Sequence, residues 1–474
     1  MASRVGTQGA QLVVFLVAAR YLSPEDFGVF TLFFAFQVLF VQLVQLGWPE
    51  FVASWEGARE VDTQAFTMAA LGGGCAALLG SIGAAVMLRF PNVAPYALLQ
   101  LTLSLPLAGA GITAVLEGWL LRSGRGAALA KIMLVSEFGG AAAAIFGLTQ
   151  GWGLISLGFG KLVGQGLLFL GSFSTARWFP RLRLQGPGTA AIATFQKNLL
   201  VSKLMWYLEQ YAATLALGLF LGPHAVGLYR AAERMVGAVA ELVFAPARVV
   251  SWMTLRPVVD SESPHTVGPA LARETERFLT LLLLAATPVF LGMASVSHAL
   301  VSVLLGEKWL AATPVVSLLC VAYLISVMSV VMPSLFSLRQ QSGQVLKLSL
   351  IMGTASVIAL LAFAPFGVVA TALGEVVAAI VIACAVGASF AKEAGVNVIR
   401  AVRLAFPSFA GSALMVLGLS AFSRVCGTLT SDVRLQLGIE VALGALIFML
   451  TFTLLGGWRR IVNIQMGSER PLKH

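Results

Sequence analysis

The sequence predicts an all-α polytopic membrane protein with about fourteen transmembrane helices. Hydrophobic residues make up 58% of the 474 residues and charged residues only 11%, whereas soluble domains carry about 25% charged residues. Apolar runs long enough to cross a bilayer recur along the whole chain, separated by short segments rich in glycine, proline and charge. No segment between these runs is long enough to hold a folded soluble domain.

The first six predicted spans are followed by a basic segment at residues 177–188, which we expect to be a linker. The segment Ser23-Pro24-Glu25-Asp26 predicts a turn and a helix start, because acidic side chains in the first turn are stabilised by the helix dipole. The six spans lie near residues 5–22, 26–54, 66–89, 93–121, 127–148 and 153–175.

A second series of six spans follows the linker, and two further apolar runs complete the chain. The series lies near residues 193–221, 225–255, 271–304, 310–337, 343–364 and 367–391, and the extra runs near 401–423 and 434–457. We therefore expect an N-terminal six-helix bundle with its basic linker at 1–188 and a C-terminal six-helix bundle at 189–392. Two extra transmembrane helices and a cytoplasmic tail are expected at 393–474.

The two series resemble one unit written twice. Near the start of each series three residues align at one constant offset, Pro24 with Pro223, Gly28 with Gly227 and Phe30 with Tyr229. Near the last span of each series the matches are Gly153 with Gly367, Gly160 with Gly374 and Lys161 with Glu375. We expect pseudo-symmetric bundles of the same orientation, with Gly28 and Gly227 allowing close helix approach.

The basic residues predict topology rather than nucleic-acid binding. The net charge is +10 at pH 7, but the chain has no long run of lysine and arginine with interleaved aromatic residues. With a cytoplasmic N-terminus, most lysines and arginines between the spans fall in cytoplasmic loops, so both termini are predicted to be cytoplasmic. The four cysteines and four histidines have no metal-binding or disulfide spacing, so we expect no metal site.

The stretch from Gly222 to Trp252 carries a charged stripe on an otherwise apolar helix. At 100° per residue Arg230, Arg234, Glu241 and Arg248 fall within about 40° of one another, with Glu233 alongside. Each such charge costs about 2.5 kcal/mol or more in hydrocarbon, so the stripe should face water or paired partners. Two interpretations stay open: internal pairs such as Arg230 with Glu233 or Arg234 with Glu241, and a functional site that uses the excess of arginine.

Three motifs carry a resemblance to a known family: ARYLSPEDFGVF at 19–30, its echo LGPHAVGLY at 221–229, and GEKWLAATPVV at 306–316. Together they resemble the polysaccharide and oligosaccharide flippases of the MATE-like exporter superfamily (multidrug/oligosaccharidyl-lipid/polysaccharide, MOP). The resemblance implies two six-helix bundles with two additional helices. It also implies export of an undecaprenyl-diphosphate-linked glycan across the bacterial inner membrane by alternating access. Such proteins are transporters and not enzymes, and the sequence has no GxxxxGK[ST] nucleotide-binding loop.

A lipid-linked diphosphate needs a cationic site, and arginine suits it because its planar fork meets two phosphate oxygens. The candidates for binding the diphosphate are Arg230, Arg234, Arg248, Lys203 and Lys161. The candidates for holding these cations in the empty state, or for binding a coupling proton or sodium ion, are Glu209, Glu233 and Glu241. No other cofactor is expected.

The first copy of the repeat lacks the charged stripe. Its residues at the positions of Arg230, Glu233, Arg234 and Glu241 are Thr31, Phe34, Ala35 and Gln42. The hypothesis is that the second bundle handles the anion and the first offers hydrogen bonds to sugar. The sugar-path candidates are Gln37, Gln42, Gln45 and Trp206, although core packing also explains Trp206.

Alternatives remain within and outside this family. A multidrug exporter or a peptidoglycan-precursor exporter would share the fold, and a membrane glycan polymerase or ligase would need a sizeable external loop that the sequence lacks. The expected partners are the lipid-linked glycan and membrane lipid, with a polysaccharide polymerase and assembly proteins as further possibilities. The expected role is the biosynthesis of a surface polysaccharide such as exopolysaccharide.

Overall fold

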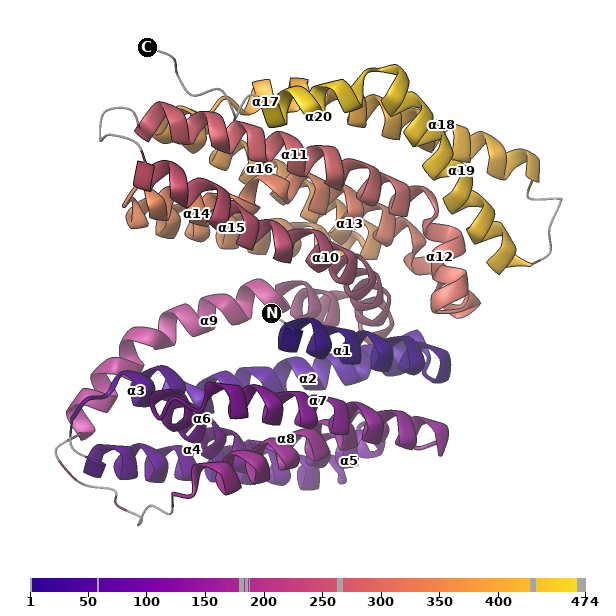
Figure 1. Ribbon diagram of the computed structural model, residues 1–474. Helices are drawn as coiled ribbons and strands as arrows, with labels where there is room; N and C mark the ends of the chain where they lie inside the picture. The colour runs from indigo at the N-terminus through magenta and orange to yellow at the C-terminus, as the bar shows by residue number, and fades with distance from the viewer. Residues whose placement is uncertain are drawn as a thin grey trace. The chain divides into compact units, whose positions relative to one another are not determined.

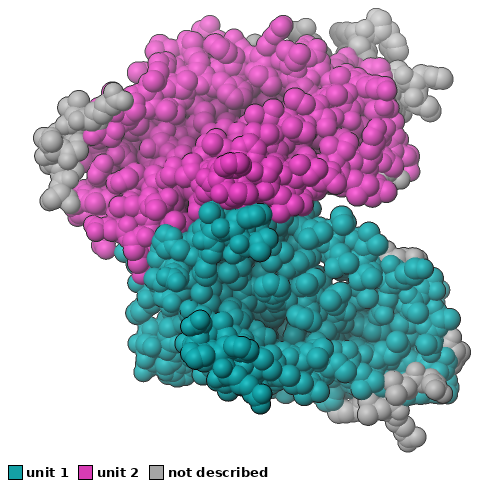
Figure 2. Space-filling view, turned by 180° about the vertical axis from the view of Figure 1, so that it is seen from behind, with its two compact units in different colours: residues 1–227 teal, residues 228–474 magenta. Residues whose placement is uncertain are grey.

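The structure is a computed structural model that describes residues 2–57, 59–178, 183, 186, 188–261, 267–426 and 432–466. Every regular element in these ranges is a helix (Figure 1). Most of the predicted linker at 177–188 lies outside the described residues. The chain forms two compact units, unit 1 at Met1–Gly227 and unit 2 at Leu228–His474 (Figure 2).

Unit 1 holds nine α-helices and one short 3-10 helix among its described residues, followed by the first turn of a tenth α-helix. These are α1 (Ala2–Tyr21), α2 (Pro24–Gln45), α3 (Trp48–Ser54), α4 (Arg59–Met87), η1 (Ala94–Tyr96), α5 (Ala97–Ser104), α6 (Leu107–Arg122), α7 (Gly126–Thr149), α8 (Ile155–Ala176) and α9 (Thr189–Phe220), then the start of α10 (Pro223–Ser261). Within the unit, α7 packs against α1 and α8, α6 packs against α3, α4 and α8, and α2 packs against α6 and α9.

The start of α2 confirms the predicted turn and helix start. Ser23 is the N-cap, and its hydroxyl accepts a hydrogen bond from the Asp26 backbone N–H at 3.0 Å. The Asp26 carboxylate in turn accepts from the Ser23 backbone N–H at 3.3 Å, which completes a capping box. This cap fixes where the chain turns from α1 into α2.

The predicted close approach at Gly28 and Gly227 is confirmed within unit 1. A Cβ atom added at Gly28 would overlap the carbonyl oxygen of Pro223, and one added at Gly227 would overlap the carbonyl oxygen of Pro24. The first turns of α2 and α10 therefore cross backbone to backbone, with the two copies of the motif in reciprocal roles. Only glycine leaves room for this crossing.

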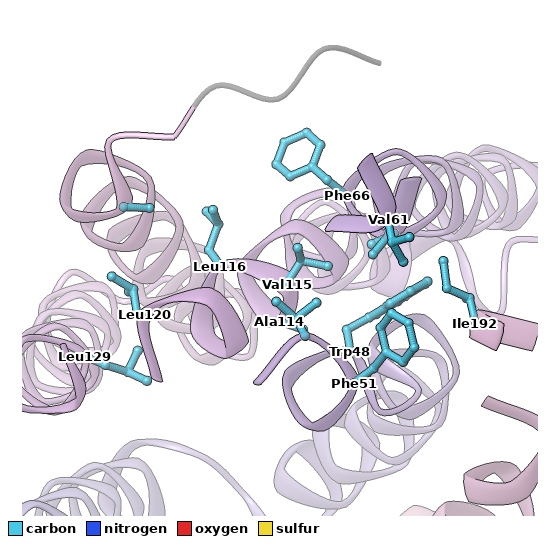
Figure 3. Close-up of a cluster of buried hydrophobic side chains, with 14 residues drawn as sticks. Trp48, Phe51, Val61, Phe66, Ala114, Val115, Leu116, Leu120, Leu129 and Ile192 are labelled. Atoms are coloured by element: carbon cyan, nitrogen blue, oxygen red, sulfur yellow. The ribbon is translucent and has the colours of Figure 1, made fainter. Parts of the chain in front are cut away.

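A buried hydrophobic cluster of unit 1 joins side chains from α3, α4, α6, α7, α8 and α9 (Figure 3). Trp48 and Phe51 of α3 lie near Ile192 of α9 and Val61 of α4 in this cluster. Close to it, the Gln64 side-chain carbonyl accepts a hydrogen bond from the Gly188 backbone N–H at 3.0 Å. The beginning of α9 is thus anchored to α4, which places α9 in unit 1.

Unit 2 begins within α10 and contains the remaining helices. These are α11 (Val267–Ser295), α12 (Ser297–Leu304), η2 (Glu307–Ala312), α13 (Thr313–Ile325), η3 (Ser326–Val330), α14 (Met332–Leu338), α15 (Ser342–Phe363), η4 (Ala364–Phe366), α16 (Val368–Ala394), α17 (Val398–Leu404), α18 (Phe406–Cys426), α19 (Val433–Leu454) and α20 (Gly457–Met466). α13 packs against α11 and α16, α15 packs against α16, and α18 packs against α11 and α19.

The helices coincide with the predicted spans, and the chain is a multi-pass membrane protein. Among the described residues, twelve helices or helix series are long and apolar enough to cross a membrane. α1 and α9, the first helix of each predicted series, are not among the twelve, so the count of about fourteen is not confirmed. The predicted division at 188 and 392 follows the sequence repeat and stays a prediction. The boundary between the two compact units falls after Gly227.

Candidate functional site

The charged stripe predicted from the sequence lies on α10, in unit 2. The Arg230 Nη1 atom lies 2.5 Å from the Glu233 Oε2 atom, one turn further along the helix. The Arg230 side chain is 15% exposed and the Glu233 side chain 31% exposed. Arg234 is also partly buried and interacts with another group of the protein. Three charged side chains therefore share a partly buried surface at the first third of the helix.

A second ion pair lies further along the same helix. The Arg248 Nη2 atom lies 2.8 Å from Glu241 Oε2, and both side chains are about half exposed, 47% and 48%. The charged stripe thus contains two internal pairs among its described residues, Arg230 with Glu233 and Arg248 with Glu241. The first of these is one of the pairs expected if the charges only stabilise the bundle.

Two tyrosines and a glutamate extend the charged region of unit 2. The Tyr229 hydroxyl, fully buried, donates a hydrogen bond to Glu375 Oε1 on α16 at 3.5 Å. Tyr323 on α13 stacks on Phe290 of α11 with ring centroids 6.2 Å apart. The Tyr323 hydroxyl lies against α10, 3.5 Å from the position of a Cβ atom added at Gly237. α10, α13 and α16 therefore bring acidic, phenolic and guanidinium groups together inside unit 2.

Sequence reasoning assigned no role to the two tyrosines. Tyr229 stands where the first copy has Phe30, so the added hydroxyl was visible as a difference between the copies. The sequence did not distinguish Tyr323 in this way, because an aromatic residue within an apolar run is typical of helix packing.

In unit 1, the two predicted cations lie in different environments. The Lys203 Nζ atom on α9 lies 3.2 Å from Glu50 Oε1 on α3, and both side chains are partly exposed. The Lys161 Nζ atom on α8 lies 5.2 Å from the centroid of the Phe34 ring on α2, a cation–π contact. Glu50 was not predicted as the partner of Lys203, because the hydropathy pattern does not indicate which helices contact each other.

The predicted sugar-path residues of unit 1 lie on α2 and α9. Gln37 is buried, and its side-chain carbonyl oxygen has no hydrogen-bond partner among the described residues. Gln42 and Gln45 are partly buried, while Trp206 and Glu209 on α9 are exposed. Gln37 is therefore an acceptor that a hydroxyl donor could satisfy, and the exposure of Trp206 argues against a purely internal packing role.

The charged side chains of this site can exchange one ionic partner for another, which is binding chemistry and not covalent chemistry. A guanidinium held by one carboxylate keeps further N–H donors for an incoming anion, and a displaced carboxylate can take up a cation or a proton. This chemistry suits the binding and release of an anionic molecule in a membrane protein.

Comparisons with known proteins identify a family for this chain. The family described as "polysaccharide biosynthesis protein" matches residues 17–314. The chain is similar to the teichuronic acid biosynthesis protein TuaB of Bacillus subtilis (strain 168), with 26% identity over 153 residues. That similarity spans 32% of this chain and 30% of the relative, so it covers less than a third of either protein.

Solved structures share the fold over nearly the whole chain. The lipid II flippase MurJ in an inward closed conformation aligns with a TM-score of 0.75 at 12% identity, covering 97% of this chain and 99% of that one. An inward-facing multidrug resistance MATE family transporter of the MOP superfamily aligns with a TM-score of 0.57 at 14% identity, covering 88% and 96%. At these identities the likeness shows the fold alone, which this chain shares with both structures.

Proposed function

Because the chain belongs to the polysaccharide biosynthesis protein family, and because its fold is that of flippases and transporters, we propose that it exports an undecaprenyl-diphosphate-linked glycan. The glycan repeat unit moves from the inner to the outer leaflet of the bacterial inner membrane by alternating access, with both termini of the protein in the cytoplasm. The product enters surface polysaccharide biosynthesis, where a polymerase and assembly proteins take it up.

One observation carries the choice of an anionic substrate: a membrane-spanning helix holds two partly buried arginines, Arg230 and Arg234, about one turn apart. Arg230 is 15% exposed and is held by Glu233 at 2.5 Å. Retaining such a charge in an apolar helix costs about 2.5 kcal/mol or more. A diphosphate repays this cost, because it accepts bidentate charge-assisted hydrogen bonds from guanidinium groups. On binding, the phosphate oxygens replace the Glu233 carboxylate at Arg230, with Arg234 and Arg248 as further donors.

In this proposal unit 1 carries its own candidates for contact with the substrate. Lys203 exchanges Glu50 for a phosphate oxygen, and Lys161 provides a second cation. Gln37, Gln42 and Gln45 of α2 offer hydrogen bonds to sugar hydroxyls, and the exposed ring of Trp206 offers an apolar face to a pyranose. The sugar head and the diphosphate are thus handled by different helices.

Transport is coupled to a proton or a sodium ion in this proposal. The carboxylates released when phosphate binds are the natural acceptors, with Glu233 and Glu241 on α10 and Glu209 on α9 as the candidates. Occupation of a carboxylate by the coupling ion prevents it from recapturing its arginine, which links ion binding to substrate binding.

The test is to locate lipid-linked glycan by leaflet in cells that lack this protein. The expected result is accumulation of undecaprenyl-diphosphate oligosaccharide on the cytoplasmic side, with loss of surface polysaccharide. Normal glycan export with new sensitivity to cationic drugs would identify a multidrug exporter. Accumulation on the outer side would identify a polymerase or ligase, and a loss of peptidoglycan precursor alone would identify a precursor exporter.

A further inference from the structure

Two short helices of unit 2 lie together at one end of its last transmembrane pair. α17 (Val398–Leu404) connects α16 to α18, and α20 (Gly457–Met466) follows α19. Because α18 and α19 pack side by side and are joined at their far ends, the start of α18 and the end of α19 lie at the same end (Figure 1). A hydrogen bond from Arg460 Nη1 to the Arg403 carbonyl oxygen, at 3.4 Å, ties α20 to α17.

α17 is amphipathic along its exposed face. Ile399 is 67% exposed and Val402 is also exposed, while Ala401 on the opposite face is fully buried. At 100° per residue the exposed residues Val402, Ile399, Arg403 and Arg400 follow one another over about 160° of the helix. The face therefore has an apolar half and a guanidinium half.

α20 repeats this arrangement. Trp458 is 51% exposed and Val462 is also exposed, and the exposed Arg459 lies next to them around the helix. Apolar residues with tryptophan beside arginines are typical of helices that lie in the membrane interface, with the apolar side chains at the level of the acyl chains. We name the exposed residues Ile399, Val402, Trp458 and Val462 with Arg400, Arg403, Arg459 and Arg460 the α17/α20 surface.

The α17/α20 surface carries more positive charge than the ion pairs formed by its described residues neutralise. Of its four arginines, Arg400 faces a carboxylate, with its Nη1 atom 3.7 Å from Glu276 Oε2. That carboxylate already accepts a short hydrogen bond of 2.6 Å from the Asn397 backbone N–H. Among the described residues no ion pair joins Arg403, Arg459 or Arg460 to an acidic side chain.

We propose that the α17/α20 surface binds the headgroup of an anionic phospholipid. The phosphate and the glycerol headgroup lie against Arg403 and Arg459, and the acyl chains continue over Ile399 and Trp458. The adjacency of guanidinium and exposed apolar groups is what distinguishes a phospholipid from a soluble anion, which would gain nothing from the apolar half. Basic residues at an anionic membrane surface contribute about 1 kcal/mol each, or roughly a fivefold change in affinity per arginine.

The test compares two matched double variants of the full-length protein in neutral detergent. R403Q/R459Q removes two exposed arginines of the α17/α20 surface, and R89Q/R434Q removes two exposed arginines at other helix ends. Binding of dioctanoyl phosphatidylglycerol and dioctanoyl phosphatidylcholine is measured by titration with native mass spectrometry. We expect the wild type to prefer phosphatidylglycerol, R403Q/R459Q to bind it roughly 25-fold more weakly, and R89Q/R434Q to bind it as the wild type does.

Three outcomes would overturn the proposal: unchanged phosphatidylglycerol affinity in R403Q/R459Q, an equal loss in R89Q/R434Q, or equally tight binding of phosphatidylcholine. Competition by inorganic phosphate at the same concentration as the lipid would also overturn it, because it would identify a simple anion site. Trp458→Ala tests the apolar half, and we expect it to weaken phosphatidylglycerol binding while leaving the binding of glycerol phosphate unchanged. The proposal does not depend on the transported substrate, since the purified protein is scored for lipid binding alone.

Discussion

The two units carry opposite charges at equivalent positions of the repeat. In unit 1 the ammonium group of Lys161 on α8 lies 5.2 Å from the centre of the Phe34 ring on α2. In unit 2 the equivalent of α8 is α16, which carries Glu375, and the position of Phe34 is taken by Glu233. Glu375 accepts a hydrogen bond from Tyr229 at 3.5 Å, and the equivalent of Tyr229 in the first copy is Phe30.

Both copies of the repeat pack their helices in the same way around these positions, but their side chains differ in charge. A Cβ atom at Gly160 of α8 would lie 2.7 Å from the Gly140 carbonyl oxygen on α7, and one at Gly374 of α16 would lie 3.1 Å from the Ala359 carbonyl oxygen on α15. Both copies therefore use a glycine to bring their last two helices together. Because this helix packing is the same in both copies, differences in charge can determine what each unit binds.

The largest expected effect comes from substituting the two glycines where the first turns of α2 and α10 cross. Gly28→Ala and Gly227→Ala each place a methyl group on a proline carbonyl oxygen, and neither backbone can move without displacing a helix. We expect each to destabilise the protein by about 3 kcal/mol or more, by the mechanism of overpacking. The two losses should be similar, because the contacts are reciprocal.

The measurement for this crossing is the thermal midpoint and yield of the purified variants. Gly83→Ala on α4 is the matched control, since a Cβ atom there meets nothing within 4 Å. A Gly227→Ala protein as stable as Gly83→Ala would refute the reciprocal crossing.

The next largest effect is expected from removing the guanidinium that distinguishes unit 2. Arg230→Ala deletes a charge-assisted contact of about 1.5–3 kcal/mol, so export should fall roughly tenfold to a hundredfold. Arg256→Ala is the control, because its exposed side chain pairs with Asp260 at 3.0 Å on the same helix and should leave export unchanged. Full export by both Arg230→Ala and Arg234→Ala would contradict anion binding by the second bundle.

Much of the fold could be predicted from the sequence, because the length of an apolar run and the position of its glycines are local properties. The predicted spans coincide with helices, and the crossing at Gly28 and Gly227 follows from the repeated motif. The anchoring of α9 to α4 could not be predicted, since it depends on the contact of Gln64 with Gly188, 124 residues away.

The partners of the charged residues were only partly predictable. Arg234 and Arg248 both lie seven residues from Glu241, so helical spacing favours neither, and the structure pairs Glu241 with Arg248. The contact of Lys203 with Glu50 joins residues 153 positions apart, which no periodicity indicates. Spacing along one helix thus predicts which charged residues could pair, whereas side-chain conformation and neighbouring helices decide which pairs form.

A smaller effect is expected from making unit 2 more like unit 1. Tyr229→Phe introduces the ring of the first copy and removes a hydroxyl that donates a long hydrogen bond of 3.5 Å to Glu375. We expect a loss of about 1 kcal/mol of stability or less and a decrease in export of a few fold, measured by thermal unfolding and by export assays. A Tyr229→Phe protein that exports no glycan would assign the hydroxyl a direct role in transport, rather than the supporting one inferred from the bond length.

The smallest expected effect concerns the pair of Lys203 and Glu50, and it separates structure from transport in unit 1. Both side chains are partly exposed at 3.2 Å, so their coupling energy should be about 0.2–1 kcal/mol in a double-mutant cycle of thermal stabilities. Exchanging the two residues, as Lys203→Glu with Glu50→Lys, restores an ion pair of opposite direction and should restore stability. If Lys203 binds the diphosphate, the exchanged protein remains defective in export, because the cation has moved from α9 to α3 and a carboxylate now faces the substrate. Recovery of both stability and export would assign the pair a structural role alone, and would leave the anion to the arginines of α10.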